Sequence, residues 1–508
     1  MSDFGSFTRL VGAGWVLARN DALIPRELEP LLPARARVLG GLVRLFAGRQ
    51  ARSGRPGERL ARALEQLGPV AIKLGQVLST RADIFGRDFA EDLGRLKDRL
   101  PPFPTNEARA EVERGLGRPL DSLYASFEPP VAAASLAQAH PARLLDGRRV
   151  AVKVLRPGVE RRVRRDIGAL ILAARFAGKL GEEARRLEPE ALAATVARSL
   201  QLELDLRFEA AGASELSEVM ALDGYMQAPE VIWTGVGKRV LTLTWAEGLP
   251  LSEPVALEQP GLNRKMLADN LIRAFLAQAL DHGVFHADLH EGNLFVAAPA
   301  RLTAVDFGII GRLGKRERRY LAEILYGFLE RNYRQVAQSH FDAGYVPAHH
   351  SVDSFAQALR AVGEPIFGHT AREVSMGAVL AQLFEITALF DMRLRPELVL
   401  LQKTMMVAEG VARRLDPEHD IWKAADPVVR RYILRELGPA QRLRQLLDDG
   451  LRSLEELARR AEAPAAAAVR EIEREEQRLA SRFTWFAVGA ALAVLASAGA
   501  FIAFELLR

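Results

Sequence analysis

Most of this chain repeats its hydrophobic residues every three or four positions, which predicts amphipathic helices. The clearest helical segments are Glu58–Phe85 and Leu267–His282, and residues 315–415 continue the pattern. Short stretches between them are rich in β-branched residues, and we expect strands there. These stretches are Arg149–Val154, Val240–Trp245, and the pair Leu294–Val296 and Leu302–Val305 with Pro299 in the turn between them. The pattern as a whole predicts an α+β protein.

The last long pattern, Phe483–Phe504, is twenty-two residues without a charge. As a helix it would be about 33 Å long, against a hydrocarbon core of about 30 Å. Arg482 and Arg508 bracket it, and Trp485 suits an interfacial end. We therefore expect residues 482–508 to hold a transmembrane helix, with a buried soluble helix as the alternative.

Composition removes several classes of chemistry. The 508 residues include no cysteine, which excludes disulfides, thiol nucleophiles and Cys-ligated zinc, so metal chemistry must rest on Asp, Asn and His. The net charge of +5 combines many charges of both signs, and we expect no nucleic-acid partner. Residues 1–59 pair apolar helical patches with arginines. Such a helix either lies on an anionic membrane surface or packs on its own domain.

The segment Asp281–Gly308 carries the densest chemistry. Asn293 follows Asp288 by five residues, and the triplet that begins at Asp306 follows Asp288 by eighteen. In kinases, an Asp and an Asn followed across a hairpin by Asp-Phe-Gly form the phosphoryl-transfer centre. Asp288 is the candidate catalytic residue. Asn293 and Asp306 are candidate Mg²⁺ ligands, because Mg²⁺ prefers carboxylate and amide oxygens.

Upstream residues suit a nucleotide-binding lobe. Lys153 sits in the expected strand Arg149–Val154, as does the lysine of a kinase VAxK strand that pairs with phosphates. An alanine-rich loop stands where kinases carry glycines, and its methyl groups limit how closely the backbone approaches phosphate. The expected interlobe hinge follows Val240–Trp245. The candidate residues for binding ATP or ADP are Ala132, Ala133, Ala134, Ser135, Lys153 and Ala246.

Polar residues recur on otherwise apolar helical segments. Lys73 and Gln76 stand three apart, so they share one helix face and need partners when buried. Asp205 and Glu209 stand four apart and also share a face. Glu203 lies about 200° around a regular helix from Asp205. Unless the helix bends there, Asp205 and Glu209 rather than Glu203 should face the cleft.

These features together resemble the UbiB family of atypical kinase-like proteins, which act in ubiquinone biosynthesis. The resemblance rests on Lys73-Leu74-Gly75-Gln76, the alanine-rich loop, Val150-Ala151-Val152-Lys153, Glu203-Leu204-Asp205, the HxDxHxGN run and the Asp-Phe-Gly triplet, across roughly residues 60–320. It implies a protein-kinase-like bilobal fold with a helical N-terminal extension and a C-terminal transmembrane helix.

The resemblance also implies roles for single residues. Lys153 would bind phosphate with Glu209 as its helix partner, and both would belong to the catalytic set with Asp288. The regulatory residues would be Lys73, Gln76, Glu203 and Asp205, on an extension that folds over the site. Leu289 and Glu291 stand where family members usually carry proline, and Glu291 adds an anionic group beside the metal ligands.

We therefore expect six regions: N-terminal basic helices 1–59, a helical extension 60–119, an N-lobe 120–248, a C-lobe 249–440, a connector 441–481 and the span 482–508. The resemblance implies a Mg²⁺-dependent ATPase, anchored in the bacterial inner membrane with its kinase-like domain in the cytoplasm. Its expected partners are membrane lipids, isoprenoid quinone intermediates and ubiquinone biosynthesis proteins, and a homodimer stays open. The alternatives are a small-molecule or lipid kinase and a non-enzymatic lipid-binding scaffold.

Overall fold

The computed structural model describes residues 3–22, 54–79, 86–94, 96, 100–179, 188–366, 382, 386, 389–392 and 396–438. The chain divides into two compact units, Met1–Arg431 and Tyr432–Arg508. The predicted transmembrane segment, the connector 441–481 and the basic stretch 23–53 lie outside the described residues. Among the helices that the structure describes, none is long and apolar enough to cross a membrane.

The N-terminal region is helical, with α1 (Asp3–Arg19), α3 (Pro56–Leu67), α4 (Pro69–Leu78) and α6 (Arg87–Gly94). The predicted helical segment Glu58–Phe85 is helical in its described part, but as two helices, because the chain breaks at Gly68. Its φ of 98° lies in the left-handed region that glycine adopts at little cost, and Pro69 then begins a new helix. Leu64 of α3 and Leu93 of α6 anchor the small hydrophobic core of this region.

An antiparallel sheet follows in the order β1-β3-β4-β5, with β2 paired to β3. Its strands are β1 (Tyr124–Phe127), β2 (Ala132–Ala133), β3 (Ala137–Leu144), β4 (Arg149–Leu155) and β5 (Val240–Thr244). Helix α7 (Thr105–Leu116) packs Val112 against Val150, Val152 and Val154 of β4 in the core of this lobe. The predicted strands in this lobe are confirmed to within one residue at each end.

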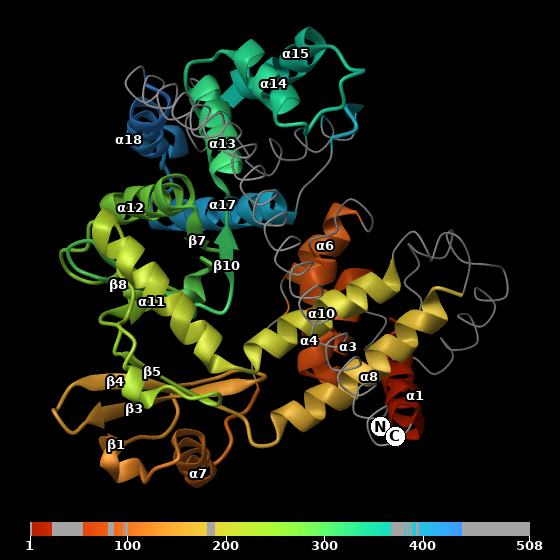
Figure 1. Cartoon of the computed structure of the whole chain (residues 1–508), viewed down its shortest axis with the longest axis vertical. Helices are drawn as coiled ribbons and strands as arrows, with labels where there is room; N and C mark the ends of the chain where they lie inside the picture. Colours follow the sequence, from red (N-terminus) through yellow and green to blue (C-terminus); the bar gives the residue numbers. More distant parts are fainter. Residues whose placement is uncertain are drawn as a thin grey trace, which may run out of the picture. The chain divides into compact units, whose positions relative to one another are not determined.

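Between β4 and β5 the structure describes the α-helices α8 (Val159–Ala177), α10 (Pro189–Glu203) and α11 (Leu206–Asp223). α1 packs against α8, and α10 packs against both α4 and α8. α11 contacts both β5 and α12 (Arg264–Ala277), so it connects the sheet to the following helical lobe (Figure 1).

The following lobe begins with α12, which continues into the π-helical turn η7 (Gln278–His282). The prediction of a plain helix to His282 is therefore correct only as far as Ala277. Two small sheets hold the catalytic segment, one pairing β7 (Val284–His286) with β10 (Ile310–Arg312). The other contains β6 (Leu249–Pro250), β8 (Leu294–Ala297) and β9 (Arg301–Ala304). The predicted hairpin around Pro299 is confirmed as β8 and β9.

The other α-helices in the described part of the chain are α13 (Lys315–Leu329), α14 (Tyr333–Asp342), α15 (Val352–Gly363), α17 (Pro396–Leu415) and α18 (Ile421–Tyr432). Short helical turns are η4 (Leu120–Ser122), η5 (Trp233–Gly235), η6 (Pro254–Leu257), η8 (Glu291–Asn293), η9 (Glu364–Ile366) and η10 (Ile433–Leu437). α17 packs on α12, behind the catalytic segment, while α14 and α15 form a separate core that includes Phe355 and Phe390.

Candidate active site

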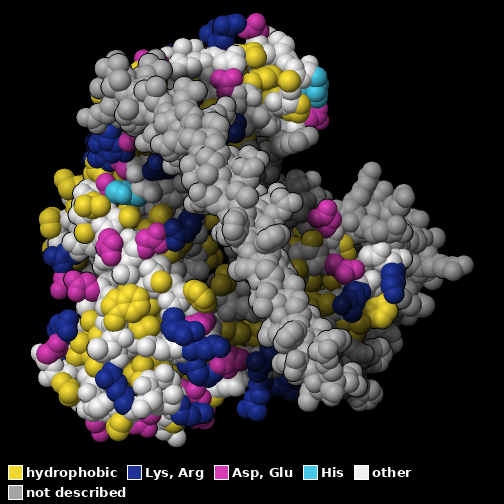
Figure 2. Space-filling view, in the orientation of Figure 1, with side chains coloured by type: hydrophobic (Ala, Val, Ile, Leu, Met, Phe, Trp, Pro, Cys, Tyr) yellow, Lys and Arg dark blue, Asp and Glu magenta, His cyan; other side chains and the backbone are white. Residues whose placement is uncertain are grey.

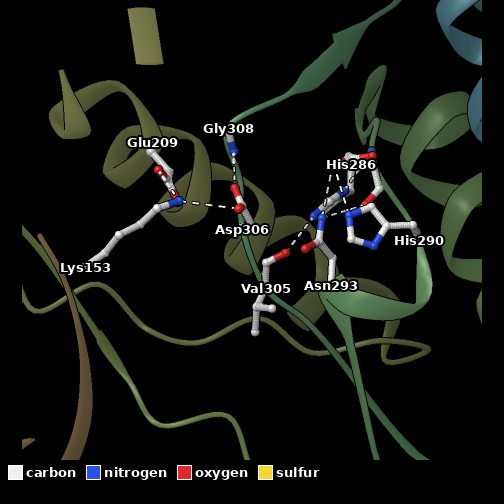
Figure 3. Close-up of polar contacts among 9 residues, drawn as sticks. Lys153, Glu209, His286, His290, Asn293, Val305, Asp306 and Gly308 are labelled. Carbon is white, nitrogen blue, oxygen red and sulfur yellow. Dashed lines mark hydrogen bonds and ion pairs between the residues drawn. The ribbon is translucent and has the colours of Figure 1, made fainter. Parts of the chain in front are cut away.

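Lys153 lies at the centre of the site because of strand alternation. Val152 and Val154 of β4 are fully buried on one face of the sheet, which places Lys153 on the opposite face. Its Nζ donates to both carboxylate oxygens of Glu209 on α11, at 2.7 and 2.9 Å, and lies 3.4 Å from Oδ2 of Asp306 (Figure 3). The structure thus brings together three predicted site residues that are far apart in the sequence.

The electrostatics of this cluster are dominated by carboxylates. Burial disfavours the Lys153 charge, but Asp306 and Glu209 outweigh it and raise the lysine pKa. Lys153 holds the pKa of Asp306 below its ordinary value, against the effect of burial. Burial raises the pKa of Glu209 to about 7, with Asp306 and Glu203 adding to the rise and Lys153 opposing it. The local excess of negative charge favours binding of an additional cation.

His286, which ends β7, organises the catalytic loop. Its ring is fully buried, and its backbone N–H donates to Oε1 of Gln278 at 3.0 Å. Nδ1 accepts from the N–H of Asp288 at 3.1 Å, so Nε2 carries the proton and donates to the Val305 carbonyl at 3.2 Å. Burial lowers the pKa of His286, which keeps this neutral arrangement. The imidazole therefore links Asp288 by hydrogen bonds to Val305, the residue before Asp306. Sequence reasoning did not assign this role to His286.

Asn293 links the same two segments from the other side. Its Nδ2 donates to the backbone oxygen of Asp288 at 3.0 Å and to Oδ2 of that residue at 3.3 Å. The N–H of Val305 donates to the Asn293 carbonyl at 2.8 Å. Because the amide nitrogen is engaged, the side-chain oxygen is the atom that can ligate a metal. This oxygen and the half-exposed Asp306 carboxylate are hard-oxygen donors, the kind of ligand that Mg²⁺ prefers.

The alanine-rich loop is a tight extension of the sheet. Ala132 pairs with Ala139 across β2 and β3, and the N–H of Ala134 donates to the Ala137 carbonyl at 2.8 Å. None of the positive-φ residues in the described part of the chain lies between 132 and 135. The loop is therefore a hairpin of ordinary backbone conformation, unlike a glycine-rich loop. Ala246 follows the end of β5 and is half-buried, at the position expected for the hinge.

The predicted regulatory residues separate into two groups. Lys73 on α4 forms an ion pair with Glu203, the last residue of α10, and Gln76 lies almost one turn further along α4. Asp205 instead caps α11, accepting from the N–H of Arg207 at 3.2 Å. The exception that the sequence left open applies, because α10 ends at Glu203 and α11 begins at Leu206. Glu203 therefore pairs with Lys73, and its charge adds to the rise in the pKa of Glu209.

Helix α17 braces the catalytic loop at two points that sequence reasoning missed. The single proton of the Thr404 hydroxyl is shared between the Leu400 carbonyl of the same helix, at 2.8 Å, and the buried carbonyl of Ala287, at 3.1 Å and 117 residues away in the chain. Arg414 forms an ion pair with Glu291, one of the two residues that depart from the family pattern. No local pattern signals either contact, because each depends on the packing of α17 against α12. The loop is thus held from the C-terminal helical part of the lobe as well as by His286.

Comparisons with known proteins agree with this architecture. Residues 95–340 match the ABC1 atypical kinase-like domain, and residues 359–420 match the UbiB helical domain. A Marinobacter nauticus protein named "Probable protein kinase UbiB" is 42% identical over 395 residues, which are 77% of this chain and 72% of the relative. A protein of the same name from Pseudomonas aeruginosa strain PAO1 is 40% identical over 422 residues, which are 82% of this chain and 79% of the relative.

A solved structure extends the agreement to the fold. The Rv3197–erythromycin complex from Mycobacterium tuberculosis has a TM-score of 0.51 and 23% identity, covering 78% of this chain and 98% of that chain. At this identity it supports the kinase-like fold alone. The two domain matches and the high identity to the bacterial relatives carry the assignment further and confirm the resemblance that the motifs predicted. The chain belongs to the UbiB family of atypical kinase-like proteins.

Proposed function

We propose that this protein is a Mg²⁺-dependent ATPase that supports ubiquinone biosynthesis at the bacterial inner membrane. The observation that carries the proposal is Lys153 held between Glu209 and Asp306, beside a catalytic loop ordered by His286. Such an arrangement suits phosphoryl transfer, in which catalysis is mostly positioning and charge stabilisation. The ubiquinone role rests on membership of the UbiB family and on the names of the relatives.

Each polar group then has a defined task. Lys153 binds nucleotide phosphates, and Glu209 fixes the direction of its ammonium group. Asn293 and Asp306 would hold Mg²⁺, which neutralises phosphate charge when bound. Asp288 orients the attacking oxygen, since its backbone is fixed by His286 and its carboxylate contacts the Asn293 amide. The loop 132–135 and Ala246 would cover the phosphates and adenine of ATP or ADP.

Isoprenoid lipid handling is the proposed output of ATP turnover. A membrane anchor at residues 482–508 would keep the site near quinone intermediates and the proteins that process them, with the kinase-like domain in the cytoplasm. Transfer to a small-molecule or lipid hydroxyl is the second candidate. It is favoured by the partial exposure of the Asp288 carboxylate, which can reach an acceptor from solvent or lipid.

The first test compares phosphate release from ATP by the full-length protein and by Asp306→Asn, with and without Mg²⁺. We expect at least a hundredfold loss in the variant. Asp146→Asn, in the exposed turn between β3 and β4, is the matched control and should retain wild-type turnover. Wild-type turnover in Asp306→Asn would refute the proposed site.

A second test separates the two candidate reactions and the pathway role. Labelled γ-phosphate appearing in a lipid extract would favour the lipid kinase, whereas release as inorganic phosphate alone would favour the ATPase. Quinone profiles of a deletion strain carrying wild-type protein, Asp306→Asn or Asp146→Asn should show restoration by the first and third only. Restoration by Asp306→Asn would instead favour a non-enzymatic scaffold.

A further inference from the structure

Outside the active site, two histidines and an aspartate meet on the surface of the helical lobe. His349 and His350 lie in the loop between α14 and α15, and Asp391 comes from a segment 41 residues beyond His350. Oδ2 of Asp391 is 3.2 Å from Nε2 of His350 and 3.7 Å from Nε2 of His349. Figure 2 shows histidine and acidic side chains next to each other at the edge of the α14–α15 region.

These separations fit a shared metal ion. Zn²⁺ binds imidazole nitrogen and carboxylate oxygen at about 2.0–2.2 Å in tetrahedral geometry, so neighbouring donor atoms lie about 3.3–3.6 Å apart. The two Asp–His distances in the structure lie just outside the two ends of this range. One donor atom from each of the three residues lies within 4.8 Å of the others. The side chains of His349 and Asp391 are 66% and 68% exposed, so small rotations that close the site disturb no core packing.

The two segments that carry these side chains are both anchored. Ser351 directly follows the histidines and caps α15, accepting from the N–H of Ser354. Phe390 directly precedes Asp391 and is buried, with its ring 4.9 Å from that of Phe355 and 5.2 Å from that of His350. The ligand atoms are thus placed by a helix cap and a hydrophobic core, which reduces the ordering needed on binding.

A simple ion pair needs only one histidine beside this carboxylate, whereas here both histidines approach the same oxygen of Asp391. The imidazole rings lie 4.1 Å apart at a tilt of 39°, and both Nε2 atoms approach the same oxygen. Asp391 itself has a φ of 48°, a left-handed conformation uncommon for non-glycine residues but tolerated by aspartate. Imidazole donors select transition metals over Mg²⁺, so this site differs in ligand class from the active site.

We propose that His349, His350 and Asp391 bind a divalent transition-metal ion, with Zn²⁺ as the fitting ion and water completing its coordination. The bound ion clamps the loop between α14 and α15 to the segment that carries Asp391. Because a metal that binds only the folded state raises stability by mass action, occupancy also raises the melting temperature.

The test uses the full-length protein after removal of any affinity tag, in excess Mg²⁺ so that hard-oxygen sites are already filled. Zn²⁺ binding is measured by competition with a fluorescent chelator, and Co²⁺ binding by its visible ligand-field bands. We expect one equivalent of high-affinity Zn²⁺ and a higher melting temperature. His350→Asn and Asp391→Asn should each weaken Zn²⁺ binding at least tenfold, while ATP turnover stays at the wild-type level.

Asp353→Asn is the matched control. Asp353 lies in the same lobe, and its exposed carboxylate is paired with Arg334 rather than with the histidines. It should bind Zn²⁺ as the wild type does. His349→Gln is the third ligand variant, and because its side chain is exposed it is the least disturbing to the fold. Circular dichroism would detect any variant that loses Zn²⁺ binding through misfolding. Equal Zn²⁺ affinity in the wild type and in all three ligand variants, or no bound equivalent in the wild type, would overturn the proposal.

Discussion

Replacing Glu209 by glutamine tests how Lys153 is held. Nζ of Lys153 lies 2.7 Å from Glu209 and 3.4 Å from Asp306. At an effective dielectric constant of about 20, the closer contact is worth about 6 kcal/mol before desolvation, and the half-exposed Asp306 contributes less. Without the Glu209 charge, the ammonium group therefore moves toward Asp306. Lys153 keeps one partner, so we expect about 1–2 kcal/mol of lost stability rather than the ~3–5 kcal/mol of a stranded buried charge.

Activity should fall much further than stability. A lysine drawn to Asp306 competes with Mg²⁺ for that carboxylate and leaves the phosphate position. We expect kcat/KM for ATP to fall at least a hundredfold, equivalent to about 2.7 kcal/mol. Burial raises the Glu209 pKa to about 7, so raising the pH from 6 to 8 ionises this carboxyl in the free wild-type enzyme. Wild-type kcat/KM should rise over that interval, and the variant should lack this rise.

Steady-state phosphate release between pH 6 and 8, with urea unfolding of the same samples, measures both effects. Glu215→Gln is the matched control, because Glu215 lies on the same helix and forms a surface ion pair with Arg312. It should cost under about 1 kcal/mol and leave kcat/KM within twofold. A folded Glu209→Gln protein with kcat/KM within threefold of wild type would refute the idea that Glu209 positions Lys153.

Three further predictions concern the helices around the site. Thr404→Val should cost about 1–2 kcal/mol in urea unfolding, because the buried Ala287 carbonyl loses the proton that the hydroxyl shares between it and Leu400. Thr195→Val on the surface of α10 loses only a same-helix bond and should cost under about 0.5 kcal/mol, and equal losses would contradict support of the catalytic loop by Thr404. Glu291→Ala and Arg414→Ala break the same ion pair, so each should lower kcat by the same factor, and the double variant should lower it no further. If the two factors multiply in the double variant, the residues act independently. Burial lowers the pKa of His340 to about 4, below the unfolded value, so its stabilising contribution is present above pH 6.5 and is lost as pH falls toward 4. Between pH 7.5 and 5.0 the wild type should lose about 2 kcal/mol more than His340→Gln in urea unfolding, and parallel losses would exclude this contribution.

The local parts of this fold were predictable from the chain. The hairpin of β8 and β9 was expected around Pro299, and the strand that carries Lys153 was expected from its β-branched run. The kinase-like fold and the family followed from motif order. These features depend on neighbouring residues, whose turn chemistry and side-chain alternation act over a few positions.

Helical periodicity was a weaker guide where the chain bends. The apolar repeat ran across Gly68 and Pro69, although both residues favour a break, and the structure ends one helix there and begins another. A regular helix would likewise have turned Glu203 away from Asp205, so the position of Glu203 depended on whether the chain bends there. In the structure α10 ends at Glu203, which allows this residue to meet Lys73 while Asp205 caps α11.

By itself, the sequence determined which chemical groups are present, in what order, and on which short elements. Tertiary structure alone decided that His286 bridges Asp288 to the Val305 carbonyl, that Thr404 supports the catalytic loop across 117 residues, and that His350 meets Asp391. The physical reason is that periodicity reflects the geometry of one backbone segment. Which distant side chains become partners depends on how helices pack, and that packing is set by the whole core.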